Sequence, residues 1–246
     1  MVNEHNPAGR LYTIIESASK KPDGQKIRQV WSEVLDCEEK DDAEITKRVV
    51  EVYNLTQDVQ RLIKLIPDIN YDLFLTAFPK IERAIFPLNL NANWKNQKMK
   101  LDPGVITTLR FCSEELNKHY SEEGVSEEDL VDVKKQIDEL FEIVNSSKID
   151  PLLRLTLLEE LERIRSAIAM YQIKGAKGLS EALQSTIGAI VSKPNEIKEL
   201  KKQKPKIMDK LFKILGKIDT ITSRALKVKK LIFDPIMAMI GNGNAG

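Results

Sequence analysis

The sequence has little of what marks secreted or fibrous proteins. Only two cysteines, Cys37 and Cys112, occur in its 246 residues, and they form no CxxC pair. A framework of disulfide bonds is therefore not expected, and a reducing cytoplasm suits the chain. Glycine and proline number only 11 and 10, which is too few for a collagen-like or broadly disordered protein.

Long hydrophobic runs and targeting signals are also missing. No apolar stretch approaches the roughly 20 residues that a membrane-spanning helix needs. The uncharged run from Ala182 to Ser192 is too short and too polar for such a helix. The first residues, MVNEHNPAGR, lack the basic start and apolar centre of a secretory signal. We therefore expect a cytoplasmic protein with no transmembrane segment.

The motifs of the common enzyme classes are absent as well. The sequence contains no GxSxG, Walker loop or GxGxxG. His119 follows Cys112 by seven residues, or about 10 Å along a helix, which is too far for a catalytic pair. Glu115 and His119 share a helix face, but the di-iron pattern of helical bundles requires Glu-x-x-His twice. We expect no catalytic residue, metal or cofactor, and hence a protein that is not an enzyme.

Helical periodicity is what the sequence has in abundance. Apolar residues recur at intervals of three and four in nearly every periodic segment, whereas no segment shows the alternation typical of a strand. These spacings predict helices over 9–20, 23–36, 42–66 and 71–86, the last of them broken or kinked near Pro79. The expected fold class is therefore all-α.

Local capping signals predict where further helices begin. Asp-Pro dipeptides supply an N-cap oxygen followed by a proline that is tolerated in the first turn, and SEED at 126–129 resembles a capping box. These signals predict helix starts near Pro103, Glu127, Pro151 and Pro235.

The centre of the chain predicts a pair of antiparallel helices. Two series of apolar residues with alternating spacings of three and four are separated by the short link NSSKID. This pattern favours an αα-hairpin with coiled-coil packing at the centre of a helical bundle. The first series is Leu130, Val133, Ile137, Leu140 and Val144, and the second is Leu157, Leu161, Ile164, Ile168 and Tyr171.

The same signals divide the chain into regions. The Asn-rich segment near Trp94 has no helical period, and loops of its length are often functional or form boundaries. The tail GNGNAG has no apolar content that could pack. The expected regions are an N-terminal helical region (1–86), a connecting loop (87–101), a helical bundle (102–192), a basic amphipathic arm (193–240) packed on the body and a disordered tail (241–246).

Positive charge is concentrated in the arm. Residues 193–230 contain 12 lysines and one arginine against four acidic residues, a net charge of +9, whereas the whole chain carries +1. From 206 to 233 an apolar stripe at helical spacing runs beside these cations. Packing of this amphipathic helix on the acidic body is the favoured interpretation. A groove in a protein partner, an anionic membrane surface and a nucleic acid are alternatives.

Candidate contacts with an anion or a partner fall in three places. In the Asn-rich loop, Trp94 lies beside Lys95 and Lys98 and could stack a base, although a buried apolar role is favoured for Trp94. The segment KGAKGL offers Lys174 and Lys177, and a plain glycine turn is favoured over an anion site there. The candidates on the arm are Lys210, Lys213, Lys217, Arg224 and Lys227.

These observations favour a non-enzymatic interaction or regulatory protein. It is expected to bind a protein partner, or a second copy of itself, through helical surfaces. One alternative is a membrane-active effector that uses the cationic C-terminal helix. Another is a nucleic-acid-associated protein that uses the arm and the loop around Trp94.

Overall fold

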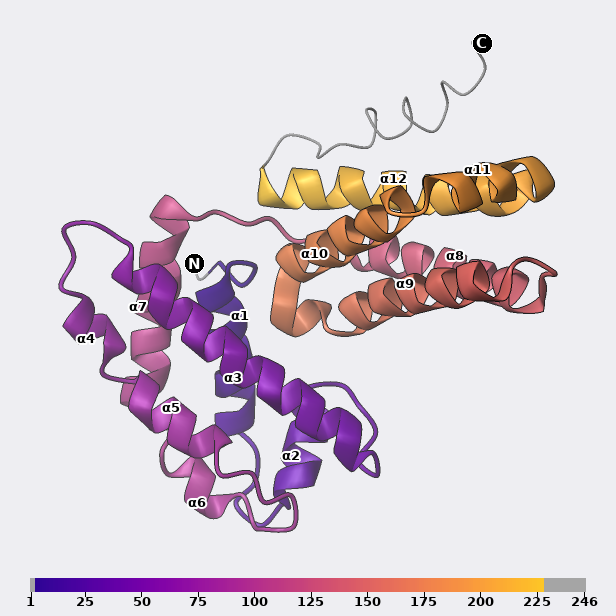
Figure 1. Ribbon diagram of the computed structural model, residues 1–246. Helices are drawn as coiled ribbons and strands as arrows, with labels where there is room; N and C mark the ends of the chain where they lie inside the picture. Colours follow the sequence, from indigo (N-terminus) through magenta and orange to yellow (C-terminus); the bar gives the residue numbers. More distant parts are fainter. Residues whose placement is uncertain (1–2, 228–246) are drawn as a thin grey trace. The chain divides into compact units, whose positions relative to one another are not determined.

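The computed structural model describes residues 3–227, and all the regular elements in this range are helices (Figure 1). The all-α class predicted from the periodicity is thereby confirmed. The described chain separates into two compact units. The first comprises 3–122 and 172–175, and the second comprises 123–171 and 176–227. The helix expected from Pro235 and the expected tail lie outside the described residues.

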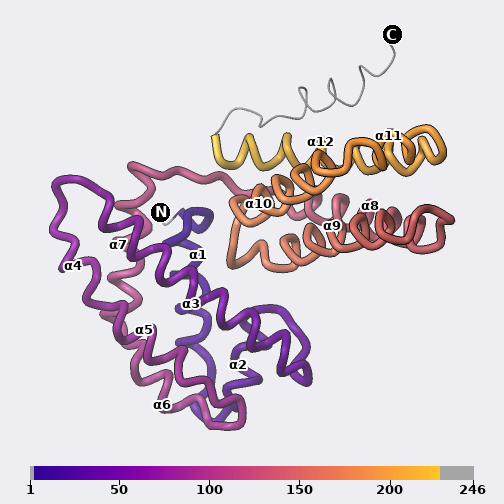
Figure 2. The backbone as a smooth tube through the Cα atoms, viewed as in Figure 1, coloured from indigo at the N-terminus to yellow at the C-terminus, as the bar shows by residue number. Residues whose placement is uncertain are grey.

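The first unit is built from helices α1 to α7. Helix α1 packs against α2, α3 and α7, and α5 packs against α3 and α7 (Figure 2). Asn6, Asp41 and Asp102 cap α1, α3 and α7, each accepting a hydrogen bond from the amide three residues later. The helices are α1 (Pro7–Ser19), α2 (Ile27–Val34), α3 (Asp42–Lys64), α4 (Tyr71–Leu75), α5 (Phe78–Ile85), α6 (Lys95–Lys98) and α7 (Pro103–His119).

Helices α4 and α5 are separate, where the sequence predicted a helix that is broken or kinked near Pro79. Pro79 lies in the first turn of α5. Its missing amide is tolerated there because the first amides of a helix have no partner within the helix. Of the two predicted alternatives, the structure has the break.

The Asn-rich loop belongs to the first unit and is tied to α2. The Ile27 amide donates to the carbonyl of Ala92 at 2.9 Å, and the Trp94 amide donates to the carbonyl of Gln25 at 2.8 Å. The rings of Trp31 and Trp94 meet edge to face with their centroids 5.5 Å apart, and both are fully buried. The segment thus packs within one unit, whereas the sequence suggested a connection between two regions.

Helix α7 also lies in the first unit, although its sequence was placed with the central bundle. It packs against α1, α3, α4 and α5. The boundary between the units falls after Glu122. An apolar helical period marks which face of a helix is buried, but it does not say which neighbour covers that face.

The second unit is built from helices α8 to α12. Helices α8 and α9 pack against each other, and α12 packs against α8 and α11 (Figure 1). Helices α7, α8 and α9 begin at the predicted Pro103, Glu127 and Pro151. The helices of this unit are α8 (Glu127–Ser146), α9 (Pro151–Ala169), α10 (Tyr171–Val191), of which 172–175 belong to the first unit, α11 (Pro194–Gln203) and α12 (Pro205–Leu226).

One hydrophobic core joins all five helices of the second unit. Every member of the two apolar series is either buried in this core or packed against its edge. Helix α10 adds Leu179, Leu183 and Ile190, and α11 adds Ile197 and Leu200. The regular spacing of apolar residues along α8 and α9 therefore marks side chains that belong to this core.

Replacing Leu161 by aspartate is expected to unfold the second unit. Leu161 is 1 % exposed in α9, so the variant places an unpaired carboxylate in an apolar core. The expected loss in the free energy of unfolding is about 3 kcal/mol or more. Leu155→Asp is the matched control, because Leu155 lies on the same helix but is 53 % exposed. Thermal unfolding followed by circular dichroism should separate the two variants, and equal melting would contradict the packing of α9.

Candidate functional site

The apolar face of α12 lies in the core of the second unit. Ile207, Leu211, Ile214 and Ile218 are all buried there, at the spacing that defined the stripe in the sequence. These side chains are the ones that would enter a membrane or a partner's groove. In this structure they contact the protein's own helices, so only the polar edge of α12 remains for an external ligand.

The cations along that edge are paired with acidic groups of the same unit. The Lys217 ammonium lies 2.6 Å from an Asp132 carboxylate oxygen and 3.4 Å from one of Asp129. The Arg224 guanidinium lies 3.3 Å from the Asp129 carboxylate. The other close pairs are Lys210 with Glu139 at 3.6 Å and Lys227 with Glu123 at 3.5 Å.

Only one candidate of the arm lacks such a partner. Lys213 is exposed and forms no ion pair within residues 3–227. The hydrogen bond from Lys217 lowers the pKa of the Asp132 carboxyl below its ordinary value and raises the pKa of Lys217 itself. The pKa of Asp129 is lowered first by the Ser126 hydroxyl and then by Lys217. Most of the predicted arm cations thus interact with α8 or with the residues just before it.

Acid is expected to remove the contribution of Lys217 to stability. Carboxyl groups whose pKa is lowered in the folded state stabilise it above their ordinary pKa of 3.8. That contribution disappears as the pH falls through the lowered value. Lys217→Gln should lower the melting temperature by no more than about 3 °C at neutral pH, because the pairs are partly exposed. The difference from the wild type should shrink as the pH falls below 3.8, and a constant difference in thermal unfolding would contradict it.

Trp94 in the Asn-rich loop is buried rather than presented to a base. Its side chain is 0 % exposed, and its indole N–H donates to the carbonyl of Ala18 at 3.0 Å. The ammonium of Lys98 donates to the carbonyl of Lys21 at 2.9 Å and lies 3.1 Å from the Asp23 carboxylate. Trp94 therefore acts as an apolar anchor for the loop, and no face of its ring is open to stacking.

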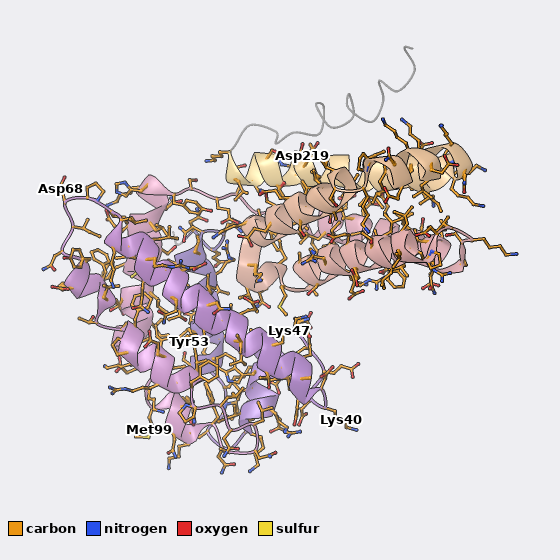
Figure 3. All side chains as sticks on the ribbon, in the orientation of Figure 1. Lys40, Lys47, Tyr53, Asp68, Met99 and Asp219 are labelled. Atoms are coloured by element: carbon orange, nitrogen blue, oxygen red, sulfur yellow. The ribbon has the colours of Figure 1, made fainter. Side chains whose placement is uncertain are left out.

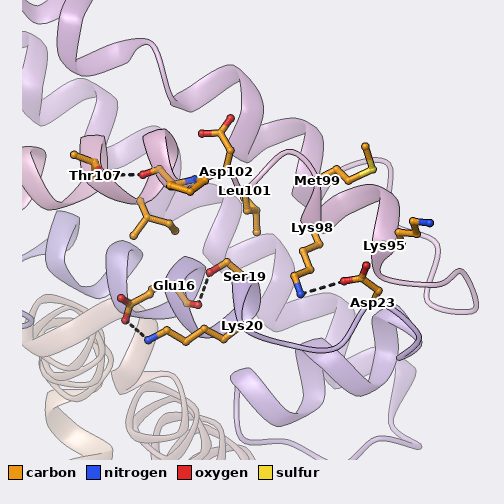
Figure 4. Close-up of a pocket in the computed structure, with 12 residues that line it drawn as sticks. Glu16, Ser19, Lys20, Asp23, Lys95, Lys98, Met99, Leu101, Asp102 and Thr107 are labelled. Carbon is orange, nitrogen blue, oxygen red and sulfur yellow. Dashed lines mark hydrogen bonds and ion pairs between the residues drawn. The ribbon is translucent and has the colours of Figure 1, made fainter.

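A hollow of about 600 Å³ lies beside this loop, between the end of α1, α6 and the start of α7 (Figure 4). Two ion pairs line it, Lys98 with Asp23 and Lys20 with Glu16, the latter at 3.0 Å. The hydrogen bond from Lys20 is the largest cause of the lowered pKa of Glu16.

Two further charged residues, Asp102 and Lys95, line the hollow. Asp102 pairs with Lys80 at 2.7 Å, and this contact lowers the pKa of its carboxyl. Lys95 is exposed at the edge and makes no ion pair among the described residues. The hollow therefore offers one unpaired cation and no convergent set of groups for a ligand.

The segment KGAKGL lies where α10 is broken. Gly175 has φ +63° and ψ −161°, a backbone conformation that interrupts the helix. The ammonium of Lys174 lies 3.0 Å from the Glu51 carboxylate, and that of Lys177 lies 3.8 Å from the Glu181 carboxylate. The glycine thus makes a turn in the chain, and both predicted lysines have carboxylate neighbours.

A buried arginine holds the turn before Gly175. Arg10 of α1 donates from Nε to the carbonyl of Ile173 at 3.1 Å and pairs with Glu122 at 2.9 Å. It also donates to the carbonyl of Lys174 at 3.3 Å. The carbonyl groups before Gly175 are therefore satisfied by a protein side chain.

The thiol and imidazole groups show no arrangement for nucleophilic chemistry. Burial raises the pKa of the Cys112 thiol to about 12, so it stays protonated at neutral pH. Its Sγ donates to the carbonyl of Phe74 at 3.7 Å. His119 is exposed, with Nε2 3.8 Å from the Glu115 carboxylate. Within residues 3–227, no three side chains of the metal-ligating types gather.

A group of lysines that the sequence reading did not single out is the clearest candidate site. We call Lys198, Lys201, Lys202, Lys204 and Lys206 the lysine cluster. Four of its members are exposed and Lys201 is half-buried. None of them forms an ion pair in the part of the chain that the structure describes. Figure 3 shows long side chains that end in nitrogen around α11.

The density of the lysine cluster distinguishes it from other unpaired lysines. Its five members lie within residues 198–206. By contrast, Lys40, Lys64, Lys135 and Lys148 are exposed without ion pairs but stand far apart in the sequence. The sequence contains this cluster as a local run of lysines. The net charge summed over the whole arm does not distinguish that run from the other cations of the arm.

Comparison of the chain with models of protein families, with curated proteins and with solved structures finds no match. Across residues 3–227, no helix has both the length and the apolar character needed to cross a membrane. The candidate site is therefore defined by geometry and charge alone, as the lysine cluster at the junction of α11 and α12.

Proposed function

We propose that the protein is a non-enzymatic interaction protein that binds a protein partner through the lysine cluster. The observation that supports this proposal is a difference in ion pairing between two groups of cations on the arm. Lys210, Lys217 and Arg224 each meet a carboxylate of α8, whereas the neighbouring cluster meets none within the described residues. A partner that supplies negative charge would complete the cluster.

The cluster costs stability in the isolated chain. Lys198, Lys201 and Lys202 stand at i, i+3 and i+4 of α11, where like charges repel by roughly 0.2–0.5 kcal/mol per pair. The helix dipole favours Lys201 and Lys202 in the last turn of α11, but it disfavours Lys206 in the first turn of α12. Lys204 stands at both helix ends, where the two dipoles act in opposite directions. A local arrangement that opposes folding is a reason to look for function.

The chemistry of the surrounding surface favours a protein partner over a membrane. The apolar residues of this stretch, Ile197, Leu200 and Ile207, are buried in the core and are not available for insertion into lipid. A membrane-active role would require such a face. The arm therefore supports that alternative less well than its sequence alone suggested.

Nucleic acid is also less well supported. Between 193 and 211 there is no arginine and no aromatic residue. Recognition of single strands relies on aromatic stacking, and arginine supplies the paired hydrogen bonds that suit phosphate. Trp94, the aromatic candidate, is buried.

The proposal is tested by two variants that remove equal charge. The cluster variant replaces Lys198, Lys202, Lys204 and Lys206 by glutamine. The control variant replaces four scattered exposed lysines by glutamine: Lys40, Lys64, Lys135 and Lys148. Affinity capture from native cell extract, quantified by mass spectrometry, should recover proteins that the wild type and the control retain and the cluster variant loses. If every captured protein is retained equally by both variants, the proposal is wrong.

A further inference from the structure

We infer that the lysine cluster recognises an acidic segment of its partner, a run of aspartate and glutamate in extended conformation. This inference rests on the proposed function and specifies the chemistry of the partner at the same site. The stretch from 193 to 213 contains eight lysines against three acidic residues, Glu196, Glu199 and Asp209, a net charge of +5. One of the three, Glu199, already accepts a hydrogen bond from Gln203 at 2.8 Å.

The geometry of the cluster sets the size of the segment. Lys198, Lys201 and Lys202 stand at i, i+3 and i+4 of α11. Lys198 and Lys202 are exposed beside the buried face of Ile197 and Leu200, and Lys201 is half-buried at its edge. At 1.5 Å per residue these three lysines cover about 6–8 Å before the turn into α12. Lys204 and Lys206 extend the cluster across that turn. At about 3.3 Å per residue, four to six residues of an extended chain are enough to pass the whole cluster.

The chemistry of lysine favours carboxylates in a flexible chain. An ammonium is a compact charge with three donors on a mobile stem, so it does not demand the fixed planar partner that arginine suits. A lysine of α12 already binds two carboxylates in this way within the protein, although these carboxylates belong to a helix. Lys217 bridges Asp129 and Asp132, two carboxylates three residues apart in α8. The lysine cluster presents the same groups without such a partner among the described residues.

A contact of this kind depends on the number of charges and on salt. Single exposed ion pairs contribute little, so several lysines must act together. Ionic strength screens exposed charges within about 10 Å at 0.1 M salt. Binding should therefore weaken steeply when salt is added, and removing four lysines should have a large effect.

The test uses a fluorescent peptide of about ten residues, rich in glutamate, and a matched peptide with glutamine in place of glutamate. Fluorescence anisotropy with the full-length chain measures the affinity. The wild type and the scattered-lysine control should bind the acidic peptide within about twofold of each other, and the cluster variant at least about tenfold more weakly. Raising salt from about 50 to about 300 mM should weaken the wild type at least about tenfold. Equal binding by the cluster variant, or by the glutamine peptide, would overturn the inference.

Two further probes test whether the negative charge that the cluster binds comes from a lipid surface or a nucleic acid instead of an acidic peptide. Vesicles containing about one third phosphatidylserine and a short DNA duplex are titrated with the same three proteins. Weaker binding of both probes than of the acidic peptide supports the inference, and cluster-dependent binding of either probe that is as tight or tighter overturns it. A negative result in these peptide, vesicle and DNA measurements would contradict the acidic-segment inference without contradicting the proposed function. A protein captured from extract in a cluster-dependent way would still support an interaction role if the acidic peptide did not bind.

Discussion

A chain that ends at Pro205 is expected to lose the fold of its second unit. Truncation there removes α12, whose apolar face fills the core against α8 and α11. Each large apolar side chain contributes roughly 1.5–3 kcal/mol when it is fully buried. The loss exceeds the stability of a typical domain, about 5–15 kcal/mol. The buried apolar residues removed are Ile207, Met208, Leu211, Phe212, Ile214, Leu215, Ile218, Ile221 and Ala225.

The unfolding of the second unit is measurable by two methods. The truncated chain should lose helical signal in circular dichroism and should bind a hydrophobic dye, because the faces of α8 and α11 that α12 covers become exposed. A chain that ends at Lys227 is the matched control, since it keeps all of α12. If the shorter chain keeps the helical content and dye binding of this control, apart from α12 itself, then α12 is not part of the core. The membrane and partner-groove interpretations of its apolar face would then regain support.

The parts of the fold that the sequence predicted well are those set by local chemistry. Helices α7, α8 and α9 begin at the predicted positions because an N-cap oxygen from Asp102, Ser126 or Asp150 pairs with an amide three residues later. The buried faces of α8, α9 and α12 follow the apolar spacing because a helix repeats every 3.6 residues. Neither relation needs knowledge of distant residues.

What the sequence did not predict depends on contacts between distant residues. The burial of Trp94 was the favoured prediction, but its contact with Trp31 was not predicted. That contact and the placement of α7 against α1 join segments whose separation exceeds 60 residues. The contact of Arg10 with the turn at Ile173 spans a still greater separation. Such pairings depend on which surfaces fit together, and periodicity contains no information about that.

The candidate site could not be predicted from the sequence for the same reason, because it depends on contacts between distant residues. The sequence directed attention to cations on α12, but Lys210, Lys217 and Arg224 pair with acidic residues that precede them by more than 70 positions. A count of charge along the chain cannot separate paired from unpaired lysines. Only the structure shows that five lysines without an ion pair among the described residues lie together on α11 and at the start of α12.

Replacing Gly175 by alanine is expected to lower the stability of the first unit by about 3 kcal/mol or more. The backbone of Gly175 has φ +63° and ψ −161°, a combination that is essentially confined to glycine. A Cβ at this position would overlap the guanidinium of Arg10 and the carboxylate of Glu122. These two groups form a buried ion pair with side chains 7 % and 1 % exposed. Alanine therefore either strains the turn or separates two charges that water cannot reach.

Gly188→Ala is the matched control, because it introduces the same methyl group on the same helix. Gly188 is exposed and helical, and a Cβ there would meet nothing within 4 Å. Alanine is the better helix former by up to about 1 kcal/mol, so this variant should be as stable as the wild type or slightly more stable. Thermal unfolding of both variants should place Gly175→Ala well below the wild type and Gly188→Ala at or above it. Equal melting of the two variants would mean that the turn at Gly175 can adopt an ordinary backbone conformation and that the ion pair of Arg10 and Glu122 does not depend on it.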